Sequence, residues 1–258
     1  DRYFVILATI DFAGGIVVHA TAVTAALVTA LTLSKRRGFP KSITPPHSPI
    51  LTMIGASMLW IGWFGFNAGS ALGANGGAGM AMLVTHISAA TASLVWMFIE
   101  WKRFGKPSLI GIVTGMVAGL ATVTPASGYI GVPGGLILGF LGGLLCYLAV
   151  DYIRGKLQID DSLDVFAVHG VGGILGTLLV AFLATSSFSG LGLAEGQTGI
   201  SQFIIQLKAV VLTVVWTSFF TYLILKLTSL VVSLRVDEQE EIEGLDLRSH
   251  GEKGYHSD

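Results

Sequence analysis

Long uncharged stretches dominate this sequence. Residues 42–99 contain no Asp, Glu, Lys or Arg over 58 positions, and residues 107–150 contain none over 44 positions. Shorter uncharged runs cover residues 12–34, 165–194 and 209–225. A helix that crosses a membrane needs about 20 apolar residues, so each of the two longest runs holds two helices and a loop. The five runs together predict seven membrane spans.

The composition agrees with a membrane protein. Charged residues make up 12% of the chain, hydrophobic residues 52%, and the mean hydropathy is +0.74. These values exclude a disordered chain, a coiled coil, a nucleic-acid-binding domain and an ordinary soluble enzyme. A single cysteine, Cys146, excludes a disulfide framework and a cysteine-based zinc cluster. We expect no metal, no cofactor and no nucleic-acid partner.

The predicted fold is all-α, a polytopic helical bundle in a lipid bilayer. The uncharged runs are far too long for the alternating strands of a membrane barrel. We expect a transmembrane domain over residues 1–233 and an acidic tail over residues 234–258. The seven predicted spans cover roughly residues 4–33, 49–72, 78–101, 107–125, 129–152, 163–186 and 203–232.

Lysine and arginine fall in alternate loops. They follow the first, third and fifth spans, whereas the loops after the second, fourth and sixth spans contain none. Basic loops stay in the cytoplasm, so the C-terminus is predicted to be cytoplasmic and residue 1 to lie outside, in the plasma (inner) membrane. Because the chain begins at Asp1, almost inside a helix, we expect that sequence is missing before it.

Many glycines recur every fourth residue, which places them on one face of a helix. The sequence contains 34 glycines, about twice the usual frequency. Stripes of small residues allow helices to approach closely in lipid, so these positions predict a tightly packed bundle. The glycines with this spacing are Gly111, Gly115 and Gly119; Gly135, Gly139 and Gly143; and Gly172 and Gly176.

Two spans begin with an acid followed by a histidine deeper in the apolar segment: Asp11 with His19, and Asp164 with His169. Ionisable groups in a membrane usually face the bundle interior or a wet cavity. A lone histidine is as well explained by a hydrogen bond to a neighbouring helix, but two such segments weaken that explanation. They run in opposite directions, as in an inverted repeat whose equivalent residues meet near the midplane. Each Asp is interpreted as a residue that caps a helix start and orients neighbouring groups, in preference to a direct ligand contact.

An aromatic run covers residues 60–70 and ends at Ser70. Composition alone favours a belt of rings at the lipid interface. The alternative is a cation site, in which ring faces attract a cation and Ser70 accepts a hydrogen bond from it. The remaining polar groups within the spans, His86, Thr122 and Thr124, are interpreted as packing residues.

Five segments together resemble the ammonium transporter (Amt/Mep/Rh) family, specifically its Amt branch. They are residues 11–19, 62–70, 122–129, 164–173 and 243–252, and they occur in the family's order along essentially the whole chain. The resemblance implies an eleven-helix protomer built as an inverted repeat, in a homotrimer with one pore through each protomer. The seven spans would be the family's fifth to eleventh helices, and the first four would be absent.

The resemblance also implies roles for single residues. His19 and His169 look like the twin pore histidines, and Phe66 looks like one of two stacked phenylalanines that gate the outer mouth. Ser70 looks like the hydroxyl of the outer ammonium site. Trp63 lies on the same motif and would line the lower pore.

The two acids differ in their expected places. Asp11 looks like the acid that supports the outer ammonium site, and Asp164 is its counterpart in the second half. The implied function is transport of ammonium or ammonia: ammonium binds outside and loses its proton, and ammonia passes the histidines. The imidazoles would hydrogen-bond ammonia, and whether they also relay the proton stays open.

The tail over residues 234–258 holds 8 of the 16 acidic residues. One interpretation is a solvated, partly disordered tail. The resemblance instead implies an ordered tail that packs on the inner face of the trimer, where a PII-type signal protein docks in bacteria and archaea.

Other functions stay open beside a transporter: a non-transporting ammonium sensor or receptor, or an incomplete transporter fragment. A membrane enzyme would need a nucleophile or metal set, and the chain has neither an HExxH motif nor a Cys/His cluster. A transporter of another fold fits the repeat but not the five motifs.

Overall fold

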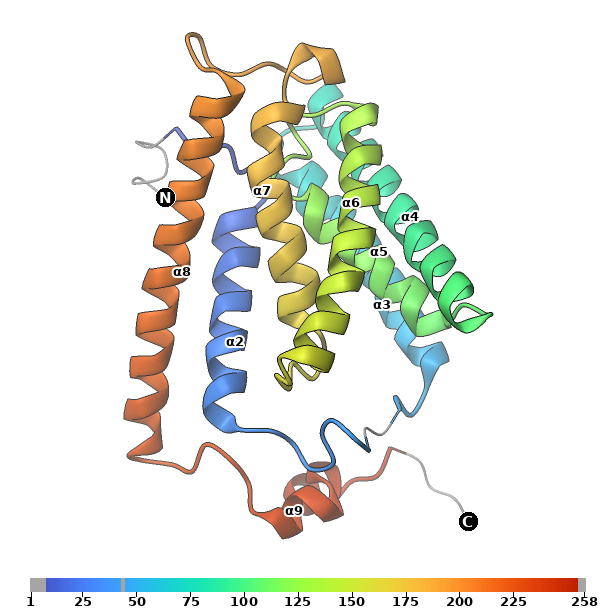
Figure 1. Cartoon of the computed structure of the whole chain (residues 1–258), viewed down its shortest axis with the longest axis vertical. Coiled ribbons are helices and arrows are strands. Elements are labelled where there is room, and N and C mark those ends of the chain that lie inside the picture. Colours follow the sequence, from blue (N-terminus) through green and yellow to red (C-terminus); the bar gives the residue numbers. More distant parts are fainter. Residues whose placement is uncertain (1–7, 43–44, 255–258) are drawn as a thin grey trace.

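The computed structural model describes residues 8–42 and 45–254, and within them all regular structure is helical, as the sequence predicts. The helices run alternately up and down (Figure 1). The α-helices are α2 (Thr21–Leu33), α3 (Pro49–Gly69), α4 (Gly76–Phe104), α5 (Leu109–Val123), α6 (Val132–Val150), α7 (Val171–Leu183), α8 (Gly199–Ser229) and the short α9 (Glu238–Glu243). Short π-helical segments are η1 (Gly15–Ala20), η2 (Asp151–Lys156), η3 (Phe166–Gly170) and η5 (Asp246–His250), and η4 (Ser186–Phe188) is a 3₁₀ turn.

Six segments of the described residues are long and apolar enough to cross a membrane. The seventh predicted span, residues 107–125, is a shorter apolar helix, because α5 has only 15 residues. Residues 124–127 follow α5 directly as a buried turn, so the buried segment is longer than the helix itself. The first predicted span begins at residue 4, but residues 1–7 lie outside the described part, and its helix begins at Gly15.

Helix boundaries follow the capping residues. Ser48, Asn75 and Ser108 accept hydrogen bonds from the first turns of α3, α4 and α5. Thr198 forms a reciprocal capping box with Ser201 at the start of α8. These side chains satisfy backbone N–H groups that have no partner within the helix.

The glycine stripes place α5 and α6 directly on α4. A Cβ atom built at Gly139 would lie 2.6 Å from the carbonyl oxygen of Ser88, and one at Gly119 would collide with the same oxygen. Gly115 and Gly143 approach the carbonyl oxygen of Ala92 in the same way. The predicted tight packing is therefore confirmed for these two helices.

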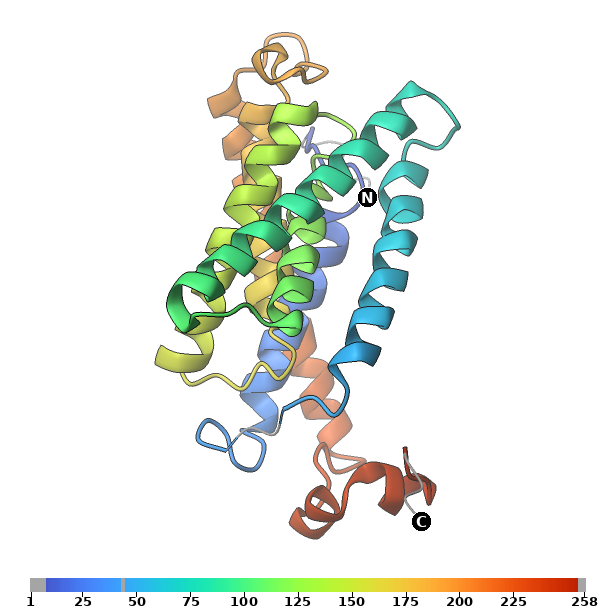
Figure 2. The ribbon, with the colours of Figure 1, turned by 90° about the vertical axis from the view of Figure 1, so that its right-hand side faces the viewer.

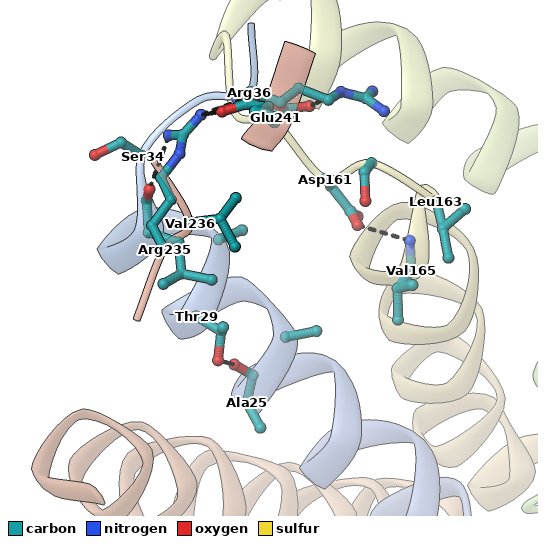
Figure 3. A pocket seen from close by; sticks show the side chains of 15 residues that line it. Ala25, Thr29, Ser34, Arg36, Asp161, Leu163, Val165, Arg235, Val236 and Glu241 are labelled. Carbon is teal, nitrogen blue, oxygen red and sulfur yellow. Dashed lines mark hydrogen bonds and ion pairs between the residues drawn. The ribbon is translucent and has the colours of Figure 1, made fainter. Parts of the chain in front are cut away.

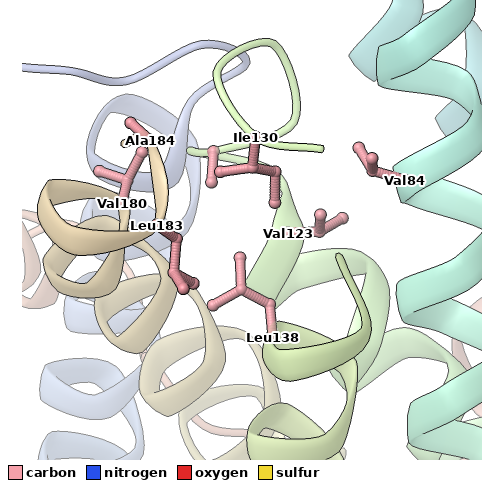
Figure 4. Packing of buried hydrophobic residues seen from close by; sticks show 8 residues of the cluster. Val84, Val123, Ile130, Leu138, Val180, Leu183 and Ala184 are labelled. Carbon is pink, nitrogen blue, oxygen red and sulfur yellow. The ribbon is translucent and has the colours of Figure 1, made fainter. Parts of the chain in front are cut away.

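A cluster of buried apolar side chains joins α4, α5, α6 and α7 near one end of the bundle (Figure 4). Helix α8 lies outside it and packs against α2 and α7 (Figure 1). Its outward face is apolar and exposed, as expected for a surface in contact with lipid. The cluster comprises Val84, Val123, Ala126, Ile130, Leu138, Val180, Leu183 and Ala184.

Two segments repeat the same backbone pattern in opposite directions. Helices α2 and α7 each have 13 residues, and each follows a π-helical segment that carries a histidine. Gly14 and Asp164 occupy matching positions before the two segments, and both have positive φ angles: 111° for Gly14 and 54° for Asp164. In Figure 1 the chain runs in opposite directions through α2 and α7, and each helix contacts the π-helical segment that precedes the other, the arrangement that the sequence predicts for an inverted repeat.

The described loops that contain Lys and Arg share one end of the bundle (Figures 1 and 2). They are the loops after α2, α4 and α6, and the tail after α8 joins them there. We call this the basic end. The connections after α3, α5 and α7 lie at the opposite end and contain no Lys or Arg.

Candidate functional site

The structure brings the two predicted histidines together. His19 of η1 and His169 of η3 have ring centroids 5.4 Å apart, with their planes inclined by 35°. His19 is 4% exposed, and its Nε2 atom is buried without a hydrogen-bond partner among the described residues. Both rings come from π-helical segments, which are rare and often lie at functional sites.

Asp11 caps the first histidine segment. Its carboxylate accepts hydrogen bonds from the backbone N–H groups of Gly15 at 2.5 Å and Ile16 at 2.9 Å, with longer bonds from Gly14 and Val17. The left-handed conformation of Gly14 turns the chain so that these donors converge on one carboxylate. The capping geometry that the sequence favours for Asp11 is therefore present.

In the second segment the cap is Asp161, and the interpretation of Asp164 as a cap is wrong. Asp161 accepts hydrogen bonds from the N–H groups of Val165 at 2.9 Å and Phe166 at 2.6 Å. Asp164 stands where the first segment has Gly14, and its carboxylate pairs with Arg154 at 2.6 Å. The missed signal is a spacing: Asp161 precedes His169 by eight positions, as Asp11 precedes His19.

Trp63 and Phe66 of α3 cover the histidine pair. The Trp63 ring is stacked at 5.6 Å from His19 and 6.1 Å from His169, inclined by 16° and 19°. Phe66 meets the His19 ring edge-on at 6.4 Å. The stacked Trp63 ring contacts both imidazoles, and the edge-on Phe66 ring contacts His19 as well, so the aromatic side chains restrict where the imidazoles lie.

Thr124 fixes the orientation of Trp63. The indole Nε1 donates a hydrogen bond of 2.9 Å to the Thr124 hydroxyl, which itself donates to the carbonyl of Leu120. Both residues are buried. Thr124 is thus more than the packing residue expected from the sequence, and the contact joins positions 61 residues apart.

The aromatic run on α3 divides between two environments. Trp63 and Phe66 face the histidines, whereas Trp60 stacks at 5.1 Å on the exposed ring of His86 from α4. Ser70 is half-buried, and its hydroxyl donates to the carbonyl of Phe66 at 2.8 Å. Within the described residues, no hydrogen bond joins Ser70 to Asp11.

A cavity of about 420 Å³ lies against the histidine pair, and we call it the histidine cavity. Apart from the two imidazoles, its lining is apolar or aromatic. An apolar cavity with two imidazoles accommodates a small neutral molecule with hydrogen-bonding capacity better than an ion. It is lined by Val18, His19, Ala22, Val23, Leu59, Gly62, Trp63, Phe66, Val165 and His169.

A second cavity of about 540 Å³ lies at the basic end (Figure 3). Helix α2, the loop before η3 and the tail enclose it, and Asp161 is among its lining residues. Val165 is the residue that the two linings share, so the cavities lie near each other.

Hydrogen bonds tie the tail to the rim of the second cavity. Arg235 binds both carboxylate oxygens of Glu241, at 2.7 and 3.0 Å, and donates to the carbonyls of Leu33 and Lys35. The backbone N–H of Arg37 donates to Glu241, and this bond together with Arg235 lowers the pKa of the Glu241 carboxyl. Arg36 pairs with Asp160 on the same rim at 3.0 Å.

The described residues contain no group of three or more His, Cys, Asp or Glu side chains that could hold a metal ion. The histidine site itself presents two imidazoles, aromatic faces and a capped backbone. Imidazole both donates and accepts hydrogen bonds near neutral pH, so the pair suits a small ligand that does the same.

Comparison with known proteins shows which family this chain resembles over most of its length. Residues 2–255 match the Ammonium Transporter Family. Over 252 residues the chain is 47% identical to ammonium transporter Amt1 of Archaeoglobus fulgidus, which covers 96% of this chain and 63% of that protein. An ammonium transporter of Aquifex aeolicus is 44% identical over 247 residues, covering 95% of this chain and 57% of the relative.

Solved structures of related proteins agree with this family match. A sensor Amt protein superposes with a TM-score of 0.87 at 31% identity, covering 96% of this chain and 62% of the other. The crystal structure of Candida albicans Mep2 superposes with a TM-score of 0.83 at 34% identity, covering 92% and 55%. The chain thus spans less than two thirds of the length of these relatives.

Proposed function

The chain belongs to the ammonium transporter family, and from this premise we propose that it forms the histidine-lined part of a path for ammonium or ammonia across a membrane. The observation that carries the proposal is the apolar cavity in which His19 and His169 lie between aromatic rings. The apolar, exposed helix faces support placement in a bilayer.

The proposed mechanism follows from the cost of moving an ion through an apolar cavity. Ammonium is recruited at the end of α3 opposite the basic end, through the hydroxyl of Ser70 and aromatic faces. It loses one proton there, because the charged form would be strongly disfavoured among apolar side chains. Neutral ammonia then passes Phe66 and accepts and donates hydrogen bonds at the two imidazoles. The proton either stays on the entry side or passes along the imidazole pair.

The acids support this path indirectly. Asp11 and Asp161 hold the backbones of the two histidine segments, and Asp11 also adds negative charge near the recruiting end. Asp164 is neutralised by Arg154 and contributes to the shape of the second segment. Trp63, held by Thr124, forms the flat wall of the path.

We further propose how the protein is oriented in the membrane, how it assembles and what its tail does. The basic end faces the cytoplasm of a plasma (inner) membrane, as the positive-inside rule requires. The protein assembles as a homotrimer with one path per protomer. Residues 234–258 form a cytoplasmic segment whose contacts with the α2 loop, through Arg235 and Glu241, influence transport and offer a docking place for a PII-type signal protein.

The function is tested by uptake into vesicles that contain the intact protein. Ammonium should accumulate faster than in protein-free vesicles, and an equal concentration of potassium should neither enter nor compete, because potassium has no proton to lose. Equal entry of potassium and ammonium would contradict the proposed mechanism.

An ammonium sensor is the second candidate, and the likeness to a sensor Amt protein favours it. A sensor would bind ammonium, seen as a ligand-dependent change in Trp fluorescence, without moving it. Binding without any flux in the vesicles would select this second function.

A further inference from the structure

We propose that Gln206, on α8, is a positioning residue that ties the backbone before the His19 segment to α7, the helix that follows the His169 segment. The inference rests on the proposed function, because its effect is measured through the passage of ammonium. It assigns to α8 a role in the path, although α8 contributes no side chain to the histidine cavity.

The side-chain amide of Gln206 forms two hydrogen bonds with the backbone of one residue, Ile10. Its Oε1 atom accepts the N–H of Ile10 at 2.9 Å, and its Nε2 atom donates to the carbonyl of Ile10 at 2.6 Å. The second hydrogen of Nε2 points to the carbonyl of Thr177 in α7 at 2.9 Å. Both donors and the acceptor of the amide are therefore used, and the residue is fully buried.

Each of these contacts leads to a histidine segment. Ile10 directly precedes Asp11, whose carboxylate caps the segment that carries His19. Thr177 lies one turn after Gly173, where a Cβ atom would stand 2.6 Å from the Cβ atom of His19. Gln206 therefore joins the entry to the His19 segment to the helix that follows His169.

Gln202, one turn earlier on α8, supports this arrangement. It is also buried, and its Nε2 atom donates to the carbonyl of Ala8 at 3.0 Å and to Gln206 Oε1 at 3.3 Å. Two buried glutamines in a helix whose outward face is apolar require partners, since unsatisfied amides in such surroundings are costly. Those partners are the backbone groups of Ala8 and Ile10 before the His19 segment and the carbonyl of Thr177 in the middle of α7.

The test compares α8 variants of the intact protein in vesicles, at equal amounts of folded protein. Gln206→Met keeps the volume and removes all the hydrogen bonds, and Gln206→Asn keeps the amide but withdraws it by one methylene. Thr213→Val is the matched control, because Thr213 is buried on the same helix and its hydroxyl has no hydrogen-bond partner among the described residues. Uptake of ammonium and of the larger methylammonium is measured across substrate concentration.

We expect both Gln206 variants to lower ammonium uptake at limiting concentration at least about tenfold, since small displacements of aligned groups have large effects. The half-saturating concentration and the ratio of ammonium to methylammonium uptake should also change, which a simple loss of folded protein would not cause. Thr213→Val should stay within about twofold of the parent.

Unchanged uptake, half-saturation and ratio in either folded Gln206 variant would overturn the inference, as would effects no larger than those of Thr213→Val. If Gln206→Met does not fold, Gln206→Asn decides by the same criteria, and failure of both to fold would overturn it, because Gln206 would then be required only for folding. A parent protein that moves no ammonium would refute the proposed function instead, so the two failures are distinguishable.

Discussion

At the scale of single residues, the site depends on side chains that orient other side chains. Trp63 faces both imidazoles, and one hydrogen bond from its buried indole to Thr124 sets the plane of the ring. The identity of the rings could be inferred from the sequence, because ionisable and aromatic residues stand out in apolar spans. Thr124 could not, since its partner lies on another helix and threonine is common in membrane helices.

This contact gives a prediction for Thr124→Val. The substitution preserves shape but leaves the buried indole N–H without an acceptor, which costs about 1–3 kcal/mol. We expect lower thermal stability and several-fold slower ammonium uptake per folded protein. Thr114→Val, on the same helix but half-buried and away from Trp63, is the control.

A double-mutant cycle isolates the contact. In a Trp63→Phe background the donor is gone, so adding Thr124→Val should have almost no further effect. Additive losses in the two variants would show that Thr124 acts on something other than Trp63.

At the scale of elements, close helix packing could be predicted from glycine spacing, and the caps only in part. Glycines spaced by four residues lie on one helix face, so tight packing was expected, but the sequence did not show that α4 is the helix on which α5 and α6 pack. The second cap was assigned to Asp164 because that acid begins the matching motif. A left-handed turn instead brings the N–H groups to Asp161, and sequence periodicity does not report such a turn.

The packing predicts opposite outcomes for two glycines. Gly139→Ala should lower thermal stability and the yield of folded protein, because its methyl group would press on the backbone of Ser88 in α4. Gly79→Ala, in α4 with no neighbour within 4 Å, should be neutral or raise helix stability by up to about 1 kcal/mol. Equal melting temperatures for the two variants would contradict the close contact.

At the scale of the whole molecule, the bundle and the tail meet through hydrogen bonds between charged tail side chains and the backbone of the α2 loop. Arg235 and the N–H of Arg37 bind Glu241, so the pKa of this carboxyl lies below its ordinary value of 4.5. Because the pKa is lowered when the tail is bound, the ionised carboxylate stabilises the bound tail fully at pH values above 4.5. This stabilisation is lost as the pH falls through the lower pKa that Glu241 has in the bound tail. The tail contacts the loop after α2 although the two are about 200 positions apart in the sequence, and sequence spacing alone could not reveal such a contact.

We therefore expect the tail to be released by acid or by Glu241→Gln. Hydrogen exchange of residues 234–254 should be slow at pH 7 in the parent and faster in the variant, and the difference should vanish as the pH falls well below 4.5. Glu238→Gln is the control, since Glu238 makes no ion pair in the described structure. Identical exchange in parent and Glu241→Gln would exclude this contact as the anchor.

The central claim is that ammonia passes between His19 and His169. The most direct measurement is simultaneous uptake and electrical current in vesicles with the intact protein, comparing the parent with the His19→Phe, His169→Phe double variant. Because His86 lies outside the histidine cavity, His86→Phe serves as the control. The account predicts that the double variant loses at least about tenfold in ammonium flux or loses its discrimination against potassium, while the control keeps both. Unchanged flux and selectivity in the folded double variant would contradict it.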